Sequence, residues 1–129
     1  MALYADIIEI NAPAQASAGS RVDIAVKVKN AFSAEIGIKV VGVPEYPGIP
    51  SGVYIDFPEP EANVGAGAVQ PFAGSFTMPN SRVTVRVYSY WYGSDGYWHF
   101  DDEMAKPVEL AAAPQPAISD FRILDYSKV

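Results

Sequence analysis

The fold of this chain is decided by residues 81–100, SRVTVRVYSYWYGSDGYWHF. In the first half of this stretch valine alternates with arginine or threonine, which is the period-two pattern of a strand that buries one face. The strand-like run continues to Tyr92 and breaks at residues 93–96, and a second aromatic run follows at residues 97–100. Two such runs joined by a short Gly/Asp loop predict a β-hairpin, which we expect at the centre of the core.

The composition is that of one folded, acidic domain. The chain has 129 residues, of which 50% are hydrophobic, and its formal net charge is −6 with a pI near 4.6. A chain of this length can bury a core without disulfide or metal cross-links. An acidic chain without a basic stripe is not expected to bind nucleic acid or to adhere to anionic lipid. There is no cysteine, so the chain offers no disulfide, thiolate nucleophile or cysteine metal site.

The N-terminal sequence MALYADIIEI has no basic n-region, no long apolar region and no A-x-A cleavage site. We therefore expect a protein made without a recognisable signal peptide. No apolar run approaches the roughly 20 residues that a membrane-spanning helix needs, so we expect no membrane insertion.

The rest of the chain carries further strand signals and no helical period. Besides the hairpin, strands are predicted at residues 5–10, 20–30, 35–43, 53–57, 69–78 and 106–110. Residues 62–68 are rich in Gly and Ala and predict a surface loop, while residues 101–103 predict a bulge or loop. About seven short strands with turns between them predict an all-β, antiparallel two-sheet sandwich.

The alternation also predicts which side chains fill the core. Arg86 should point outward, beside a buried Val85. Trp91, or alternatively Trp98, should pack among the core residues. The positions expected to be nearly inaccessible are Val22, Ile24, Val26, Val28, Ile36, Ile38, Val83, Val85 and Val87.

A short strand, the loop APAQASAG at residues 12–19 and a long alternating strand that ends at Asn30 open the chain. This arrangement resembles the opening of many immunoglobulin-like surface modules, including the CARDB type. The resemblance covers about the first 30 residues and implies an immunoglobulin-like sandwich over residues 1–110. It concerns the fold and carries no fingerprint of an activity.

Beyond the sandwich, the sequence predicts a linker at residues 111–116 and one more strand-forming segment at residues 117–129. A single sandwich has no obvious place for this segment, so we expect an assembly arm that docks on a neighbouring subunit. The alternatives are that it folds back to complete its own sheet, or that it begins the next domain of a longer protein. The apolar residues of the arm are Ile118, Phe121, Ile123, Leu124 and Tyr126.

Residues that could carry chemistry are few. His99 is the only histidine, so a zinc site is not expected and a surface histidine on a strand is the ordinary interpretation. Asp95, Asp101, Asp102 and Glu103 could offer oxygen ligands to calcium, but their spacing matches no calcium-loop signature. We expect solvated acidic loop ends there. With no nucleophile elbow or phosphate-binding loop either, the sequence predicts no catalytic residue, metal or cofactor, and no enzyme.

The aromatic side chains of the hairpin are the other candidate site. Alternation places Tyr88, Tyr90 and Tyr92 on the face that also carries Arg86, and Trp98 is grouped with them. A flat row of exposed aromatic rings stacks well on sugar rings. The competing interpretation is that the row packs against a loop, the C-terminal segment or a neighbouring subunit.

These features favour a non-enzymatic structural or assembly protein that contacts copies of itself or a shell protein. By analogy with immunoglobulin-like modules, we expect a virion component such as a capsid decoration, accessory or tail subunit, on the surface of a virion or extracellular particle. The alternative is a carbohydrate-binding or adhesion module that uses residues 88–100 to bind a glycan. A further alternative is a subunit of an extracellular filament.

Overall fold

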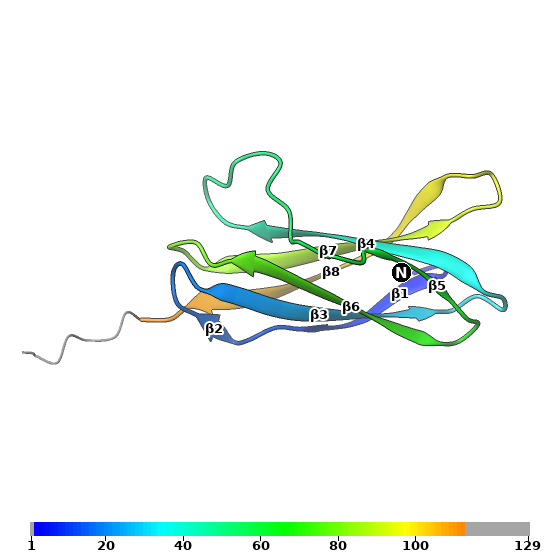
Figure 1. The fold of residues 1–129 in the computed structure, drawn as a ribbon, viewed down its shortest axis with the longest axis horizontal. Coiled ribbons are helices and arrows are strands. Elements are labelled where there is room, and N and C mark those ends of the chain that lie inside the picture. The colour runs from blue at the N-terminus through cyan, green and yellow to red at the C-terminus, as the bar shows by residue number, and fades with distance from the viewer. Residues whose placement is uncertain (1, 113–129) are drawn as a thin grey trace, which may run out of the picture.

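The computed structural model describes residues 2–112, which form two β-sheets packed face to face (Figure 1). The strands are β1 (Ala5–Asn11), β2 (Gln15–Ala16), β3 (Arg21–Asn30), β4 (Ile36–Glu45), β5 (Glu61–Val64), β6 (Val69–Thr77), β7 (Val83–Tyr92) and β8 (Trp98–Leu110). One sheet has the order β1-β3-β6 and the other has the order β2-β8-β7-β4-β5. All pairs are antiparallel except the short β2–β8 pair. The prediction of an all-β two-sheet sandwich is confirmed.

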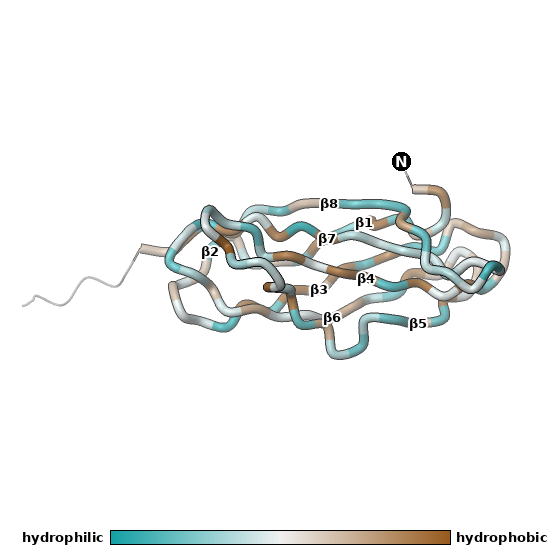
Figure 2. Tube along the Cα trace, turned by 90° about the horizontal axis from the view of Figure 1, so that it is seen from above, coloured by the Kyte–Doolittle hydropathy of each residue, from teal (hydrophilic) through white to brown (hydrophobic). Residues whose placement is uncertain are grey.

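The core forms where the alternating strands face each other. The predicted valines and isoleucines of β3 and β7 are buried, and the apolar stretches run through the middle of the molecule (Figure 2). Val85 has no exposed surface while Arg86 lies on the outer face, so the predicted register of the central strand is confirmed. Ile36 is the exception. It begins β4 at the end of the sandwich and is only half-buried.

Trp91 is the tryptophan that packs against the core. Its ring meets Tyr4 edge-on at a centroid distance of 4.8 Å and stacks on His99 at 4.5 Å. Trp98 is on the opposite face of the hairpin, where it contacts Tyr92. Of the two tryptophans considered as the core residue, Trp91 therefore has that place.

The prediction of a strand at residues 53–57 is wrong. This segment makes one bridge, between Asp56 and Ser75, and the Ile55 N–H donates to the carbonyl of Gly42 at 2.8 Å. It crosses from the edge of one sheet to the edge of the other and buries Ile55 and Phe57 between them. A Cβ at Gly74 would lie 2.7 Å from Phe57 Cε1, so glycine makes room for the crossing.

Two short strands were not predicted. The loop expected at residues 62–68 begins as strand β5, which pairs with β4 through Ile36 to Lys39. Strand β2 pairs with the end of β8. Both are short edge elements whose sequences carry little strand propensity, so backbone pairing with a longer neighbour determines them.

The acidic stretch after Phe100 contains the predicted bulge. Ser89 pairs with Asp102 and Tyr90 pairs with Phe100, which leaves Asp101 as the extra residue of β8. The strand then continues without a break to Leu110.

The bulge turns two carboxylates toward strand β1, so the expectation of solvated loop ends is wrong for Asp101 and Asp102. Asp101 accepts hydrogen bonds from the backbone N–H groups of Leu3, Tyr4 and Ala5, at 2.6, 2.7 and 2.5 Å. Asp102 accepts one from the Ile7 N–H at 3.0 Å. The two carboxylates therefore join the edge of the three-stranded sheet to the five-stranded sheet.

At the other end of β8, the Ala111 N–H donates to the Ala16 carbonyl at 2.8 Å. The predicted assembly arm and most of the predicted linker lie outside the described residues. Across residues 2–112, no helix is long and apolar enough to span a membrane.

Candidate binding site

The outer face of the five-stranded sheet carries two rows of side chains that cross β5, β4, β7 and β8. Strand pairing places one row at Asn63, Gly37, Tyr92 and Trp98, and we call it the Trp98 row. The next row consists of Glu61, Lys39, Tyr90 and Phe100, and we call it the Phe100 row. Together the two rows form the aromatic platform.

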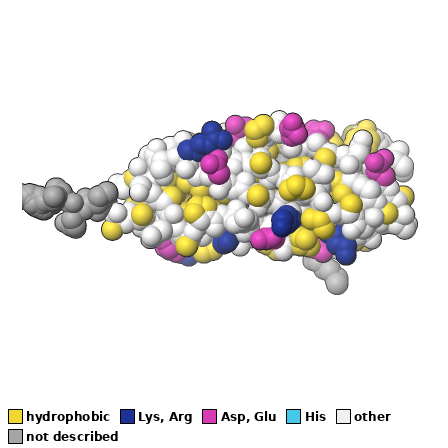
Figure 3. All heavy atoms as spheres, turned by 60° about the horizontal axis from the view of Figure 1, so that its bottom comes forward, with side chains coloured by type: hydrophobic (Ala, Val, Ile, Leu, Met, Phe, Trp, Pro, Cys, Tyr) yellow, Lys and Arg dark blue, Asp and Glu magenta, His cyan; other side chains and the backbone are white. Residues whose placement is uncertain are grey.

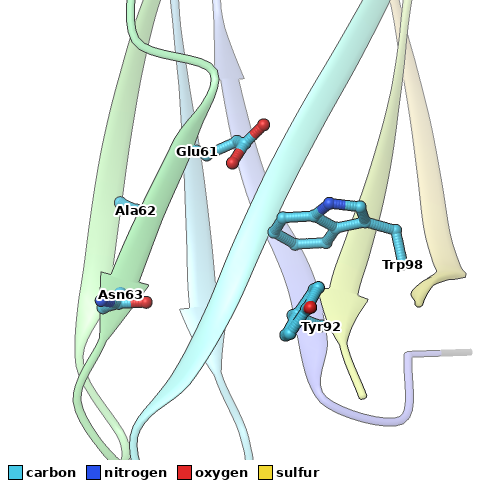
Figure 4. A pocket seen from close by; sticks show the side chains of 5 residues that line it. All are labelled: Glu61, Ala62, Asn63, Tyr92 and Trp98. Atoms are coloured by element: carbon cyan, nitrogen blue, oxygen red, sulfur yellow. The ribbon is translucent and has the colours of Figure 1, made fainter. Parts of the chain in front are cut away.

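A pocket of about 480 Å³ opens on the Trp98 row (Figure 4). The rings of Tyr92 and Trp98 meet at 5.1 Å with an angle of 67° between their planes, and they form its aromatic side. Glu61 and Asn63, on strand β5, form its polar side, and β4 runs between the two sides.

Gly37 lies in β4 between the two sides and lets the side chains around the pocket approach the strand closely. A Cβ at this position would lie 3.2 Å from Tyr92 Cβ, 3.5 Å from Trp98 Cη2 and 3.6 Å from Asn63 Oδ1. Any side chain here would therefore press against the two rings and the amide. A glycine in the interior of a strand weakens it, and such glycines often mark a place where another molecule approaches closely.

Strand β5 brings the polar groups to the pocket and is held at its end by Asn30. The buried Asn30 side-chain amide donates to the carbonyls of Val64 and Gly65 at 2.8 and 3.2 Å. Its Oδ1 accepts from the Phe32 N–H at 2.8 Å. The same amide donates to the Ala34 carbonyl at 2.9 Å, so one buried side chain ties the end of β5 to the segment that follows β3.

Lys39 joins the two rows. Its Nζ lies 4.9 Å from the centre of the Trp98 ring and 5.2 Å from the centre of the Tyr90 ring. Both distances are within the range of a cation–π contact. The ammonium group therefore contacts a ring of each row and places its N–H donors beside both of them.

The Phe100 row leaves the ring at its β8 end open to solvent. Phe100 is 56% exposed, and it contacts Tyr90 at 5.9 Å and Tyr88 at 6.1 Å. Burial raises the pKa of Tyr88 above its ordinary value, and the carboxylates of Glu103 and Glu45 add to the rise. The Tyr88 hydroxyl is therefore protonated at neutral pH and can both donate and accept.

The hairpin turn beside Trp98 is fixed by a short polar network. His99 Nε2 lies 2.8 Å from Asp95 Oδ2, and the Tyr97 N–H donates to Asp95 Oδ1 at 3.1 Å. These two contacts, that with His99 first, lower the pKa of Asp95. Because His99 also stacks on Trp91, the turn is anchored to the partly buried side of the hairpin, and this anchor positions Trp98.

The structure brings the four predicted aromatic residues, Tyr88, Tyr90, Tyr92 and Trp98, together on one face. That they face a ligand stays a prediction. Sequence reasoning missed the polar side of the pocket, formed by Glu61 and Asn63, and it missed Gly37 and Lys39. No local pattern marks these residues, because only the pairing of β4 with β5 and β7 places them beside the rings.

A further pocket of about 540 Å³ lies at the other end of β4 and carries one aromatic ring; it is lined by Glu45, Tyr46, Pro47, Ile49, Ser81, Arg82 and Thr84. The face shown in Figure 3 has acidic and basic side chains dispersed beside each other, and Arg21 pairs with Asp23 and Lys27 with Glu9 on the three-stranded sheet. Within residues 2–112 no group of three or more His, Cys, Asp or Glu side chains is placed to hold a metal ion. The platform can offer stacking and hydrogen bonds.

Comparison with known proteins supports the architecture. The ASH/PapD-like domain of human CEP192 (PapD-like domain 7) is similar with a TM-score of 0.62 at 8% identity, over 88% of this chain and 89% of that chain. The fold is immunoglobulin-like. The CARDB domain of the PF1109 protein from Pyrococcus furiosus, in complex with di-metal ions, has a TM-score of 0.54 at 13% identity, over 86% of this chain and 92% of that chain. The predicted resemblance to CARDB modules is therefore confirmed as a likeness of fold.

A third similar structure is Pseudomonas fluorescens alkylpurine DNA glycosylase AlkC bound to DNA containing an abasic site analog. Its TM-score is 0.55 at 16% identity, and the match covers 84% of this chain and 31% of that chain. No family model matches the sequence, and no curated protein matches it. At these identities the likeness concerns the fold alone.

Proposed function

We propose that this chain is a non-enzymatic recognition module that binds a carbohydrate on the aromatic platform. The observation that carries the proposal is the pocket that has the rings of Tyr92 and Trp98 on one side and the polar groups of Glu61 and Asn63 on the other. Small-molecule sites combine an apolar wall with a few directed polar groups in this way.

A sugar ring matches both sides of this pocket. Its C–H face is apolar and can stack on the aromatic side of the pocket, while its hydroxyls lie around the ring edge and need both donors and acceptors. The Glu61 carboxylate accepts, and the Asn63 amide donates and accepts. A cationic ligand is a poorer match, because Lys39 already lies over the Trp98 ring and would repel it.

The proposal is tested by retention of the chain on insoluble cellulose, chitin and β-glucan. We expect the wild type to be retained on at least one of them and Trp98→Ala to elute with the unbound fraction. The matched control is Tyr54→Ala, which removes a ring that is 62% exposed in the loop after β4, outside the platform. This variant should be retained like the wild type.

A second variant keeps both rings and changes their position. Gly37→Ala places a Cβ 3.2 Å from Tyr92 Cβ and 3.5 Å from Trp98 Cη2, so it should shift the rings and reduce retention while the fold is kept. If the wild type is retained on none of these polysaccharides, or if Trp98→Ala is retained as well as the wild type, the carbohydrate proposal fails.

Our second proposal is that the chain assembles into a virus particle or another extracellular particle. The observation that favours it is that both edge strands of the three-stranded sheet expose an apolar side chain, Ile8 in β1 and Val69 in β6. The bulge at Ile8 and the proline at position 71 make these edges poor partners for a further strand, so contact through side chains is the better-supported mode. The mass of the full chain measured by light scattering over a concentration series tests it, and a monomer at every concentration contradicts self-assembly.

A further inference from the structure

We infer that the platform has a second stacking subsite at Phe100, so that its ligand is a polysaccharide chain laid along β8 and not a single sugar or a chain end. This inference rests on the proposed carbohydrate function and names the form of the ligand. It is carried by the Phe100 row, which the pocket on the Trp98 row does not include.

The spacing of the two rings fits consecutive units of a polymer. Trp98 and Phe100 are two residues apart on the same face of β8, which places their Cα atoms about 6.5–7 Å apart along the strand. This is comparable with the length of one pyranose unit in an extended chain. In β-1,4-linked glucans the substituents are equatorial, so the chain is an extended ribbon with an apolar face at each ring that can lie along the outer face of β8.

Phe100 leaves an aromatic surface open to solvent, since its side chain is 56% exposed. It contacts the tilted rings of Tyr88 and Tyr90, which lie beside it at 6.1 and 5.9 Å. These contacts help to hold the ring in position while part of its surface stays available for stacking.

Polar groups flank the second subsite as they flank the first. The Lys39 ammonium contacts the rings of Tyr90 and Trp98, so it lies between the two rows and can donate to hydroxyls of neighbouring sugar units. Beyond Tyr88, Arg86 bridges Glu45 at 3.0 Å and Glu103 at 2.8 Å. The Tyr88 hydroxyl, protonated at neutral pH, supplies a further donor beside Phe100.

The test is calorimetric titration of the full chain with glucose and with β-1,4- and β-1,3-linked glucose oligomers of two, four and six units. We expect affinity to rise from glucose to the disaccharide in the series that binds, because two consecutive units reach both rings. Phe100→Ala should weaken disaccharide and hexasaccharide binding about five- to tenfold, the effect of losing one aromatic contact, and leave glucose binding within about twofold. Trp98→Ala should weaken binding of all these ligands.

Two further variants keep the result interpretable. Phe100→Trp retains a stacking ring and should retain the length dependence. Tyr97→Ala removes a ring that is 70% exposed in the hairpin turn and should bind as the wild type does. Thermal melts of each variant check that the fold is intact.

The outcomes distinguish a failure of the second subsite from a failure of the proposed carbohydrate function. If the wild type binds glucose as tightly as the oligomers, or if Phe100→Ala binds the hexasaccharide like the wild type while Trp98→Ala does not, the second subsite is wrong and the carbohydrate function stands. If no oligomer of either linkage binds and no polysaccharide retains the chain, the proposed function is overturned, and the second subsite with it.

Discussion

Replacing Asp101 by alanine removes the carboxylate that accepts three backbone hydrogen bonds from the start of β1. Its partners are the N–H groups of Leu3, Tyr4 and Ala5, more than ninety positions earlier in the chain. The exposed Leu3 amide can turn to water at little cost. The Ala5 amide belongs to a residue with no exposed surface, so it would stay buried without a partner.

The loss of stability depends on whether each released N–H group reaches water, as at Leu3, or stays buried, as at Ala5. Leaving a buried donor without a partner costs about 1–3 kcal/mol, and a hydrogen bond to a charged acceptor contributes about 1.5–3 kcal/mol. With Leu3 discounted and Tyr4 half-buried, we expect Asp101→Ala to lower the free energy of unfolding by about 2–4 kcal/mol. At about 4 °C per kcal/mol for a domain of this size, the melting temperature should fall by roughly 8–16 °C.

The assay is urea denaturation followed by Trp fluorescence, with amide hydrogen exchange on the same variants. Glu103→Ala is the matched control, because it removes a carboxylate from the same strand whose partner is the part-exposed Arg86. This control should cost at most about 1 kcal/mol. Exchange of the Ala5 amide should accelerate in Asp101→Ala alone. Equal destabilisation by the two substitutions, or an unchanged Ala5 amide, would refute the role assigned to Asp101.

Three further predictions concern the core, the crossing segment and the hairpin turn. Val85→Ala should cost on the order of 1–3 kcal/mol in urea denaturation, from lost transfer energy and a residual cavity; a cost near zero would contradict the register of β7. Gly74→Ala should cost about 1–3 kcal/mol in the same assay, because its Cβ would meet the Phe57 ring at 2.7 Å; a neutral result would contradict the close crossing. An NMR titration should give Asp95 a pKa below its ordinary 3.8, so that its contribution to stability is present above about pH 4 and is lost as the pH falls through the lowered value. His99→Ala should move that pKa back toward 3.8, and an unchanged value would contradict the assigned cause.

The elements that sequence reasoning predicted well are those with a strong local period. The strands β3 and β7 alternate over their whole lengths, and the Gly-Ser-Asp-Gly sequence before Tyr97 marks the hairpin turn. The same alternation put the tyrosines of β7 on one face, because a strand sends successive side chains to opposite sides. The aromatic half of the candidate site could therefore be predicted from the sequence.

The elements that were missed depend on contacts between distant segments. Residues 53–57 alternate like a strand, but the glycines at 42 and 74 let them cross between the sheets. The polar side of the pocket depends on the pairing of Gly37 with Asn63, and the role of Asp101 depends on amides at the far end of the chain. A single sequence carries no local signal for partners of this kind.

The central claim is that a sugar binds in the pocket formed by Tyr92, Trp98, Glu61 and Asn63, and an NMR titration of the ¹⁵N-labelled chain with the cellulose and β-glucan hexasaccharides tests it most directly. We expect the largest shifts at the Trp98 indole N–H, the Gly37 amide and the Asn63 side-chain amide. Amides of the three-stranded sheet, such as Asp23 and Lys27, should not move. Absence of any shift at high ligand concentration, or shifts confined to the three-stranded sheet, would contradict the account.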